Sequence, residues 1–335
     1  MAVELLEAKY LIILQIFLFP LSAYSETFDE WKIKFSKYAT SQGVSEETLS
    51  LIIKNLRFLP KVIEYDRYQP EFYEDTSTYV GKRANTKKVN IGLKTYKNNL
   101  ELINQVEKKF NIEKELLLAL MGIETNFGTY VGKMDILSSL ATLSYDKRRS
   151  EFFTNELLTL LKLIDNNQID YKSLYGSWAG AFGFFQFMPS TIKNHAIDFN
   201  KDNYIDLKDS NDAYASAANY LNNIGWKKDT PCFYKIELKK NIPKKYLNVS
   251  AKQITNKKKL KFFKKYIQEN LILNNLNDEI KVAIVTPDKD IVPDAETLNP
   301  AFIVFENYEK ILQWNRSLRF ALAVCTLKDK FNDEL

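Results

Sequence analysis

Residue types that dominate metal and nucleotide chemistry are scarce in this 335-residue chain, which has one histidine, two cysteines and ten glycines. A single histidine, His195, excludes a multi-histidine metal site and leaves one candidate base for a Ser-His or Cys-His pair, with no nucleophile motif around it. Neither G-x-x-x-x-G-K-[ST] nor G-x-G-x-x-G occurs. The sequence therefore argues against a hydrolase triad and against nucleotide chemistry.

The chain is nevertheless rich in core-forming residues. Hydrophobic residues make up 45% of it and aromatic residues 13%, which is typical of folded proteins and not of disordered ones. Its length is sufficient for two or three packed units.

The N-terminal residues indicate export. Residues 11–21 form an apolar block of signal-peptide length that is too short to span a bilayer comfortably. Ala23 and Ser25 supply small residues for a cut after Ser25, although Glu4 and Glu7 are atypical of the positively charged start of a signal. We predict a signal peptide over residues 1–25, with a buried helix or an uncleaved anchor as alternatives. No cysteine nearby can carry a lipid, so a soluble periplasmic protein is expected.

The two cysteines are Cys232 and Cys325. They could form a disulfide in an oxidising compartment. Cys325, however, lies in the apolar helical pattern "ALAVCTL", and the sequence favours a small buried thiol there.

Positive charge is concentrated in one segment. The net charge is +5, and much of the excess lies in residues 239–266. We interpret this segment as a solvated lysine face, and the alternative is attraction to an anionic polymer of the cell envelope. Predicted export argues against nucleic acid as a partner.

The spacing of apolar residues divides the chain into regions. Intervals of three and four predict helices over residues 26–109 and again over 111–161. Short β-prone runs after Cys232, such as "IKVAIVTP", predict strands. We expect a mainly α (α+β) fold with a helical N-terminal part (26–109), a core (110–231), a small β-rich part (232–308) and a C-terminal helix that packs back on the helical region (309–335).

Oxygen-bearing side chains recur within residues 198–209 at the spacing of an EF-hand loop. Counted from Asp198 they occupy positions 1, 3, 5, 9 and 12, and Tyr204 can offer its carbonyl oxygen at position 7. The candidate ligands are Asp198, Asn200, Asp202, Tyr204, Asp206 and Asp209. Asn203 replaces the usual glycine, and Asp209 is shorter than the usual glutamate. We predict a weakly bound structural Ca²⁺, and the alternative is a metal-free polar turn.

One carboxylate stands at the end of the most apolar stretch of the predicted mature chain. Glu124 follows "LLLALM" (116–121), and Gly128 and Gly132 mark a break after it. Burial and the negative end of the helix dipole both disfavour the charged form, so the pKa of Glu124 is expected to be raised and the group to serve as a general acid. A buried glutamate paired with an arginine is the alternative.

Six separated stretches of the sequence are informative when they are taken together, in the order in which they occur along the chain. They are "QPEF" (69–72), "GIETNFG" (122–128), "LATLSYDKRRSEFF" (140–153), "GSWAGAFGFFQFMPS" (176–190), the Asp198 loop and "NRSLRFALAV" (315–324). Together they resemble the lytic murein transglycosylase B family, bacterial envelope enzymes that cut the glycan of peptidoglycan. The resemblance implies a lysozyme-like catalytic core with the helical and β-rich parts attached.

The resemblance also implies roles for individual residues. Glu124, in the G-[IV]-E-[TS] motif, would be catalytic. The matching places Ser177, Gln186 and Asn315 along the glycan cleft, and Arg148 and Arg149 towards the peptide side of the substrate. Phe184 stands where a polar side chain is expected, which puts one sugar hydrogen bond in doubt and leaves stacking as its substitute.

The reaction implied by the resemblance needs no cofactor. Glu124 would protonate the glycosidic oxygen between N-acetylmuramic acid and N-acetylglucosamine and then deprotonate the muramic 6-hydroxyl, giving a 1,6-anhydro sugar. Glycan strands would be the partner of a monomeric protein. One alternative is a lysozyme-type hydrolase, which uses two carboxylates and for which the fold could bring Asp135 near. Another is an exported protein that binds glycan without cutting it.

Overall fold

The computed structural model describes residues 26–68, 73–288 and 298–335. The predicted signal peptide (1–25) and the "QPEF" stretch (69–72) lie outside the described residues. Within the described ranges, no helix is long and apolar enough to cross a membrane.

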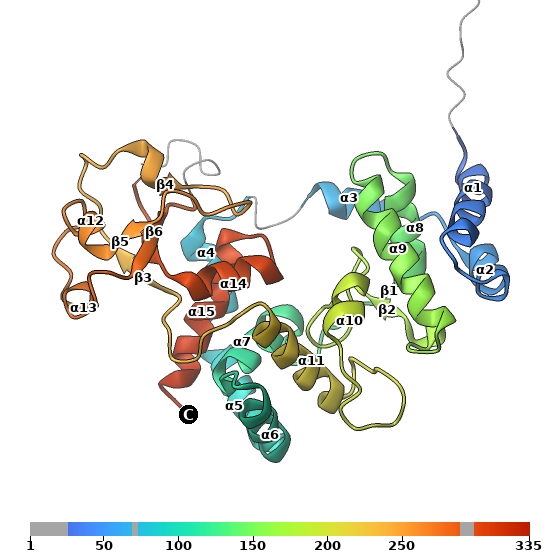
Figure 1. Ribbon diagram of the computed structural model, residues 1–335, viewed down its shortest axis with the longest axis horizontal. Helices are drawn as coiled ribbons and strands as arrows, with labels where there is room; N and C mark the ends of the chain where they lie inside the picture. Colours follow the sequence, from blue (N-terminus) through green and yellow to red (C-terminus); the bar gives the residue numbers. More distant parts are fainter. Residues whose placement is uncertain (1–25, 69–72, 289–297) are drawn as a thin grey trace, which may run out of the picture.

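One group of helices combines the start of the described chain with a segment from its middle. Helices α1 and α2 pack together, α2 contacts α9, α3 contacts α8, and α8 lies along α9 (Figure 1). Thr27 and Glu30 form a capping box that starts α1. The bounds are α1 (Phe28–Ser41), α2 (Glu46–Ile52), η1 (Ile53–Asn55), α3 (Pro60–Arg67), α8 (Ile136–Tyr145) and α9 (Ser150–Asp165).

The second group surrounds the largely buried helix α7. It contacts α5, α6, α11 and α15, while α4 packs along α15. The helices of residues 26–109 are therefore divided between the two groups, with α1–α3 in the first and α4–α6 in the second (Figure 1). The bounds are α4 (Thr76–Arg83), α5 (Thr86–Asn98), α6 (Leu100–Phe110), α7 (Lys114–Thr125), α10 (Pro189–His195), α11 (Ser210–Asn223), α14 (Glu306–Trp314) and α15 (Leu318–Asn332).

A small sheet with its own core lies beside α14 and α15 (Figure 1). Its strand order is β3-β7-β6-β4, with β5 also paired to β6. All pairs are antiparallel except β4 with β6. The bounds are β3 (Phe233–Ile236), η4 (Lys244–Tyr246), β4 (Leu247–Asn248), β5 (Lys258–Lys259), α12 (Leu260–Lys264), α13 (Leu271–Asn274), β6 (Lys281–Val285) and β7 (Ala301–Val304). The predicted α+β class is confirmed.

Cys232 and Cys325 form a disulfide that joins the start of this sheet region to α15. The prediction of a free buried thiol is therefore wrong. Cys325 is fully buried in α15, as its apolar pattern indicated, but its partner lies 93 residues away in the sequence. A local apolar pattern predicts burial but does not show whether the one other cysteine of the chain lies close enough to pair.

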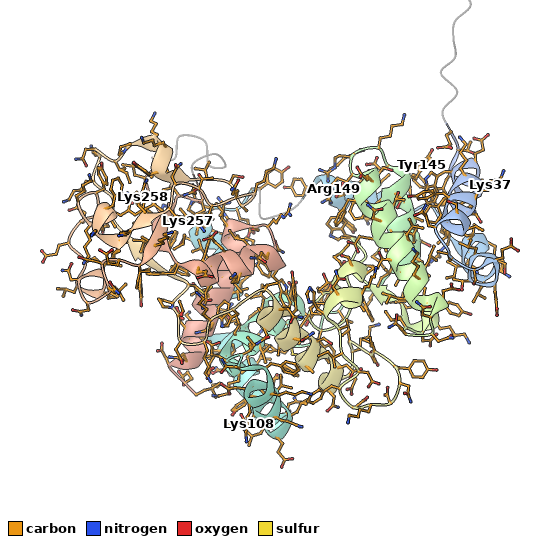
Figure 2. The ribbon with its side chains drawn as sticks, in the orientation of Figure 1. Lys37, Lys108, Tyr145, Arg149, Lys257 and Lys258 are labelled. Carbon is orange, nitrogen blue, oxygen red and sulfur yellow. A yellow bond between two sulfur atoms is a disulfide. The ribbon has the colours of Figure 1, made fainter. Side chains whose placement is uncertain are left out.

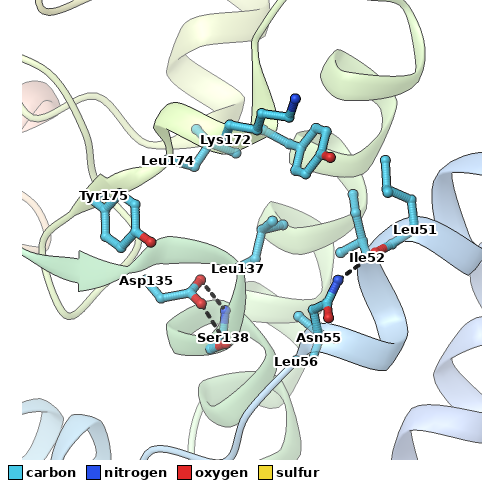
Figure 3. Close-up of a pocket in the computed structure, with 11 residues that line it drawn as sticks. Leu51, Ile52, Asn55, Leu56, Asp135, Leu137, Ser138, Lys172, Leu174 and Tyr175 are labelled. Carbon is cyan, nitrogen blue, oxygen red and sulfur yellow. Dashed lines mark hydrogen bonds between the residues drawn. The ribbon is translucent and has the colours of Figure 1, made fainter.

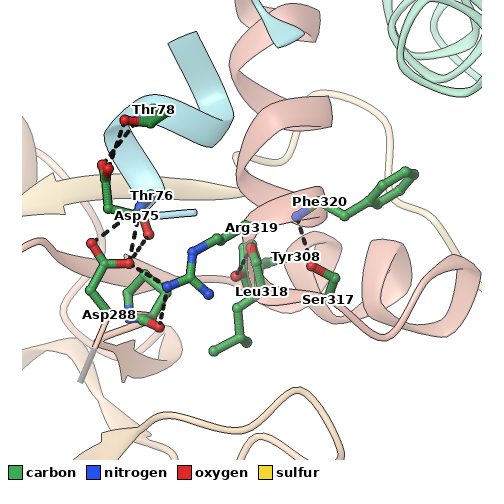
Figure 4. Close-up of polar contacts among 10 residues, drawn as sticks. Asp75, Thr76, Thr78, Asp288, Tyr308, Ser317, Leu318, Arg319 and Phe320 are labelled. Carbon is green, nitrogen blue, oxygen red and sulfur yellow. Dashed lines mark hydrogen bonds and ion pairs between the residues drawn. The ribbon is translucent and has the colours of Figure 1, made fainter. Parts of the chain in front are cut away.

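A buried ion pair ties three further segments together (Figure 4). Arg319 in α15 donates from Nη2 to Asp288 Oδ1 (2.6 Å) and to the carbonyl oxygen of Pro287 (2.9 Å). Asp288 also accepts from the backbone N–H of Thr76, at the start of α4 (3.0 Å). These contacts fix α4 and α15 against the end of β6, and so help to hold the surroundings of α7.

Candidate active site

Glu124 lies in the last turn of α7, and its side chain is half-buried. Residues 116–120 of the helix are completely buried, so the helix is held by packing on all sides. It ends as the sequence predicted, because Asn126 adopts a left-handed conformation (φ 50°) and its N–H bonds back to Met121. The carboxylate is thereby fixed at the end of a rigid buried element.

The carboxylate accepts a hydrogen bond from an indole. Trp314 Nε1 donates to Glu124 Oε1 over 3.0 Å. Trp314 is the last residue of α14, 190 residues further along the chain. Trp314 was not among the predicted site residues. It directly precedes the predicted cleft residue Asn315, and this position could have indicated that it lies near the site.

An aromatic cluster holds this indole in position. Tyr220 of α11 stacks on Trp314 with ring centroids 5.0 Å apart, and Phe187 meets it edge-on at 5.3 Å. Phe185 lies between Trp314 (6.3 Å) and the buried Tyr214 (5.5 Å). Burial raises the pKa of Tyr220, so its hydroxyl stays neutral. The cluster fixes the donor against the end of α7.

The loop of residues 176–188 is attached to the residue after Glu124. Thr125 donates from Oγ1 to the carbonyl oxygen of Phe184 (2.8 Å) and accepts from the N–H of Gly128 (3.0 Å). Gly183 has φ 81°, and a Cβ there would lie 2.4 Å from Leu207 Cβ. Only glycine allows this close approach, so Gly183 is required for the loop to pack against Leu207.

Four predicted cleft residues lie in this loop or next to Trp314. Gln186 donates from Nε2 to the carbonyl oxygens of Gly183 (2.8 Å) and Val131 (3.3 Å). Ser177 Oγ accepts from the N–H of Ala181 (3.0 Å). The Phe184 ring lies against Gly128, and Asn315 caps α14. The structure thus brings Phe184 next to the end of α7 and places Asn315 beside the indole that contacts Glu124.

Arg148 and Arg149 instead contact Asp66, a buried residue of α3. Arg148 donates from Nε to Asp66 Oδ2 (2.7 Å), and Arg149 binds the other carboxylate oxygen. Arg149 also lies over the Phe153 ring, 4.8 Å from its centroid. Figure 2 places it beside α3 in the first helix group. The two guanidinium groups therefore share one carboxylate within the protein.

The residues of the predicted EF-hand loop bind backbone N–H groups. Asp198 accepts from Lys201 (2.7 Å) and Asn203 (2.9 Å). Asp202 accepts from Tyr204 (2.9 Å), and Asp209 caps α11 by accepting from Asn211 (2.8 Å). Across the described part of the chain, no group of three or more His, Cys, Asp or Glu is placed to hold a metal ion.

Asp212, in the first turn of α11, holds this loop, although it was not among the predicted ligands. Its two carboxylate oxygens accept from the N–H groups of Phe199 (2.8 Å) and Asp206 (2.9 Å). The residue is completely buried, and burial raises its pKa. It lies three residues beyond the twelve-residue EF-hand pattern, so the spacing of that pattern does not include it.

A pocket of about 180 Å³ lies in the first helix group (Figure 3). Its lining includes Leu51, Asp135, Leu137 and Tyr175 and does not include Glu124. The Asp135 carboxylate caps α8 by accepting from Ser138 N (3.1 Å) and Ser138 Oγ (3.0 Å). Asp135, the candidate second carboxylate, thus has a structural role in starting α8.

Three comparisons relate the chain to known proteins. Residues 27–329 match the family described as Transglycosylase SLT domain. The chain is similar to membrane-bound lytic murein transglycosylase B of Escherichia coli (strain K12), with 42% identity over 129 residues, and the match covers 38% of this chain but only 36% of that relative. SltB3 from Pseudomonas aeruginosa, solved in complex with NAG-anhNAM-pentapeptide, has a TM-score of 0.78 and 28% identity, over 92% of this chain and 80% of that one. The Escherichia coli lytic transglycosylase Slt35, solved in complex with calcium, has a TM-score of 0.74 and 25% identity, over 90% of this chain and 93% of that one.

Proposed function

The chain belongs to the transglycosylase SLT domain family, in its lytic murein transglycosylase B group, and we propose that it cleaves the glycan strands of peptidoglycan as a lytic transglycosylase. The observation that carries the proposal is the position of Glu124 at the end of a buried helix, hydrogen-bonded by Trp314. The NAG-anhNAM ligand of the relative SltB3 supports the substrate class.

In the proposed reaction, Glu124 begins protonated and donates its proton to the glycosidic oxygen while the bond from that oxygen to the muramic C1 breaks. The muramic 6-hydroxyl then attacks C1, and Glu124 takes the hydroxyl proton. The products are a 1,6-anhydro end and a free 4-hydroxyl, no water is consumed, and the enzyme returns to its starting state. A single carboxylate suffices, in contrast to the pair used by conventional glycosidases.

Trp314 determines which carboxylate oxygen carries the proton. An indole N–H is a donor only, so Glu124 Oε1 has to remain an acceptor in both protonation states. The exchanged proton is therefore carried by Oε2. We infer that Trp314 orients the acid in this way and that the aromatic cluster supplies the rigidity.

The surrounding predicted residues would bind the sugar chain. Ser177, Gln186 and Asn315 would offer polar groups to the sugars, and the half-buried Phe184 would offer an aromatic face. Arg148 and Arg149 share the single negative charge of Asp66 and are partly exposed, so one positive charge of the pair is left for a peptide carboxylate.

Calcium would be a structural ligand and would take no part in the reaction. The relative Slt35 is solved with calcium, and the hard oxygen donors of Asp198, Asn200, Asp202, Tyr204 and Asp209 suit this ion. These carboxylates also accept from backbone N–H groups of the loop, and they keep lone pairs for a cation. Weak affinity is expected because Asn203 replaces the usual glycine and Asp209 is shorter than the usual glutamate.

Activity on purified peptidoglycan tests the proposal. Wild-type protein should clear a suspension of sacculi and release soluble fragments. In the cell, we expect it to act as a monomer in the periplasm, where its substrate lies. Sedimentation with sacculi without clearing would instead identify a glycan-binding protein that does not cut.

A further inference from the structure

The end of α7 that carries Glu124 is closed by a side chain from another helix. Lys88 of α5 donates from Nζ to the main-chain carbonyl oxygen of Gly122 over 2.6 Å. Gly122 lies two residues before Glu124, in the last turn of α7. Lys88 was not among the predicted site residues, and it lies 34 positions before Gly122 in the sequence. The contact joins α5 to the turn that holds the candidate acid.

The carbonyl group of Gly122 needs this donor because the chain turns away from the helix axis. In a continuing α-helix the N–H of Asn126 would donate to Gly122. Asn126 and Phe127 instead adopt left-handed conformations (φ 50° and 59°), and both of their N–H groups donate to the carbonyl oxygen of Met121. Lys88 thus supplies a hydrogen bond that the backbone does not provide, as basic side chains do at other helix ends.

The face of α5 that carries Lys88 packs tightly against this turn. Gly92 lies four residues after Lys88, and so on the same face of α5. The Phe127 ring lies between the two helices, because a Cβ on Gly92 would be 2.9 Å from it and a Cβ on Gly122 would be 2.7 Å from it. The two glycines let the ring bridge α5 and α7, which fixes the backbone of Lys88 close to the end of α7.

Lys88 also differs from the other lysines of its helix. Lys88 is half-buried, whereas the other three lysines of α5 are exposed (Lys87, Lys94 and Lys97). Its pKa is lowered, first by burial and second by the neighbouring Arg83, and no carboxylate among the described residues offsets this. Desolvating a cation without an acidic partner costs free energy, so a solvated surface lysine does not describe this residue.

Two further cations lie around the start of α5, and both are engaged by other groups. Arg83, the last residue of α4, pairs with Glu74 at 3.0 Å. Lys330 of α15 donates to the carbonyl oxygen of Ala84 over 2.6 Å. Neither contact involves the carbonyl group of Gly122, which is held by Lys88.

The other ionisable groups on the helices around α7 lie at its far end or are favoured in their neutral forms. Two ion pairs lie at the start of α7, away from Glu124 (Glu107 of α6 with Lys114 at 3.6 Å, and Lys328 of α15 with Glu113 at 3.7 Å). Burial raises the pKa of three further groups and so favours their neutral forms (Asp329 of α15, Tyr214 and Tyr220 of α11). Lys88 is therefore the cation that these helices bring to the last turn of α7.

We propose that Lys88 is a positioning residue for Glu124. Its ammonium group ties the last turn of α7 to α5 and places a positive charge at the negative end of that helix. In the proposed reaction Glu124 becomes negatively charged once it has given its proton, and the helix end opposes that charge. Lys88 offsets this opposition and so makes proton donation easier. The inference rests on the proposed function, in which Glu124 is the acid.

Titration of Glu124 tests the inference without any turnover. Carbon-13 NMR can follow its carboxyl carbon, and the loss of the signal in Glu124→Gln identifies it. Lys88→Met removes the cation, so the titration midpoint of Glu124 should move up by about 0.2–0.7 pH units. Lys87→Met changes an exposed neighbour on the same helix and should leave the midpoint in place.

The same midpoint in the wild type and in Lys88→Met would overturn the inference. If Lys88→Met does not fold, Lys88→Gln, which also removes the charge, gives the same comparison.

Kinetics separate positioning from a purely structural role. Lys88→Met should lower kcat about 3- to 10-fold and leave KM nearly unchanged, because the contact acts on the acid and not on the bound substrate. Lys88→Arg keeps the charge and its donors and should recover most of kcat. The alkaline limb of the kcat profile should move to higher pH in Lys88→Met, because the acid keeps its proton longer.

Two results would contradict the role of Lys88 while leaving the proposed function intact. One is a normal kcat in Lys88→Met beside an active wild type, even with a lower melting temperature. The other is an equal loss of kcat in Lys88→Met and Lys88→Arg. A wild type that turns over no sacculi would instead overturn the proposed function.

Discussion

Glu124 and Asp66 are two carboxylates removed from bulk water, and their partners differ. Asp66 is buried in the first helix group between two guanidinium groups, Arg148 and Arg149. Glu124 is half-buried at the end of α7 and accepts from the neutral indole of Trp314. A carboxylate between two cations is stabilised in its charged form. The indole N–H can donate to Glu124 in either protonation state of the carboxyl group, as the proposed acid requires.

The sequence left open whether Glu124 was one member of a structural ion pair. Asp66 shows what such a pair looks like in this molecule, namely a buried carboxylate held by two arginines. The comparison therefore makes opposite predictions for the two residues: loss of function at one and loss of stability at the other.

The largest effect is expected at Glu124. Glu124→Gln keeps a carbonyl oxygen for Trp314 and removes the exchangeable proton, so turnover of sacculi should fall about 10²- to 10⁴-fold. Stability should be unchanged or slightly higher, because an ionisable group no longer has to be desolvated. Fragment release and a thermal melt measure the two quantities. A variant destabilised by about 3–5 kcal/mol would instead indicate a broken ion pair.

The reverse pattern is expected at Asp66. Asp66→Asn leaves Arg148 and Arg149 without their counter-charge, but both arginines are partly exposed, so the loss of stability is about 1–3 kcal/mol. Denaturant unfolding measures it. Asp29→Asn serves as the control, because Asp29 is exposed and its pair with Lys32 is a surface one. Equal effects of the two changes would remove the structural role assigned to Asp66.

These two residues also show what the sequence could predict. The apolar run and the following glycines placed Glu124 at a helix end, and the structure agrees. The indole that donates to Glu124 lies 190 positions away in the sequence, and the partners of Asp66 lie more than 80 positions away. No local periodicity encodes such distances. Trp314 was missed for the same reason.

A smaller effect is expected from the indole donor. Trp314→Phe keeps an aromatic ring in the cluster and removes one hydrogen bond to the acid, which corresponds to a loss of about 3- to 10-fold in turnover. Trp314→Tyr, which retains a donor, should recover part of it. Trp31→Phe changes a tryptophan of the first helix group and should have no effect. Full activity of Trp314→Phe would show that the hydrogen bond does not orient Glu124.

The smallest effect concerns calcium. If the 198–209 loop binds the ion, a concentration ten times Kd stabilises the folded state by about 1.4 kcal/mol, which raises the melting temperature by a few degrees. Asp202→Asn should abolish the rise without changing turnover. Melting curves that coincide in calcium and in chelator would leave the loop as a metal-free turn.

The mass of the glycan ends released by the wild type tests the central claim most directly. Proton return to Glu124 from the muramic 6-hydroxyl predicts 1,6-anhydro ends, each lighter by one water than a hydrolysed end. Digestion of purified sacculi followed by mass spectrometry should therefore give anhydro-muramyl fragments, and Glu124→Gln should give almost none. Reducing ends alone from the wild type would contradict the account and identify a hydrolase.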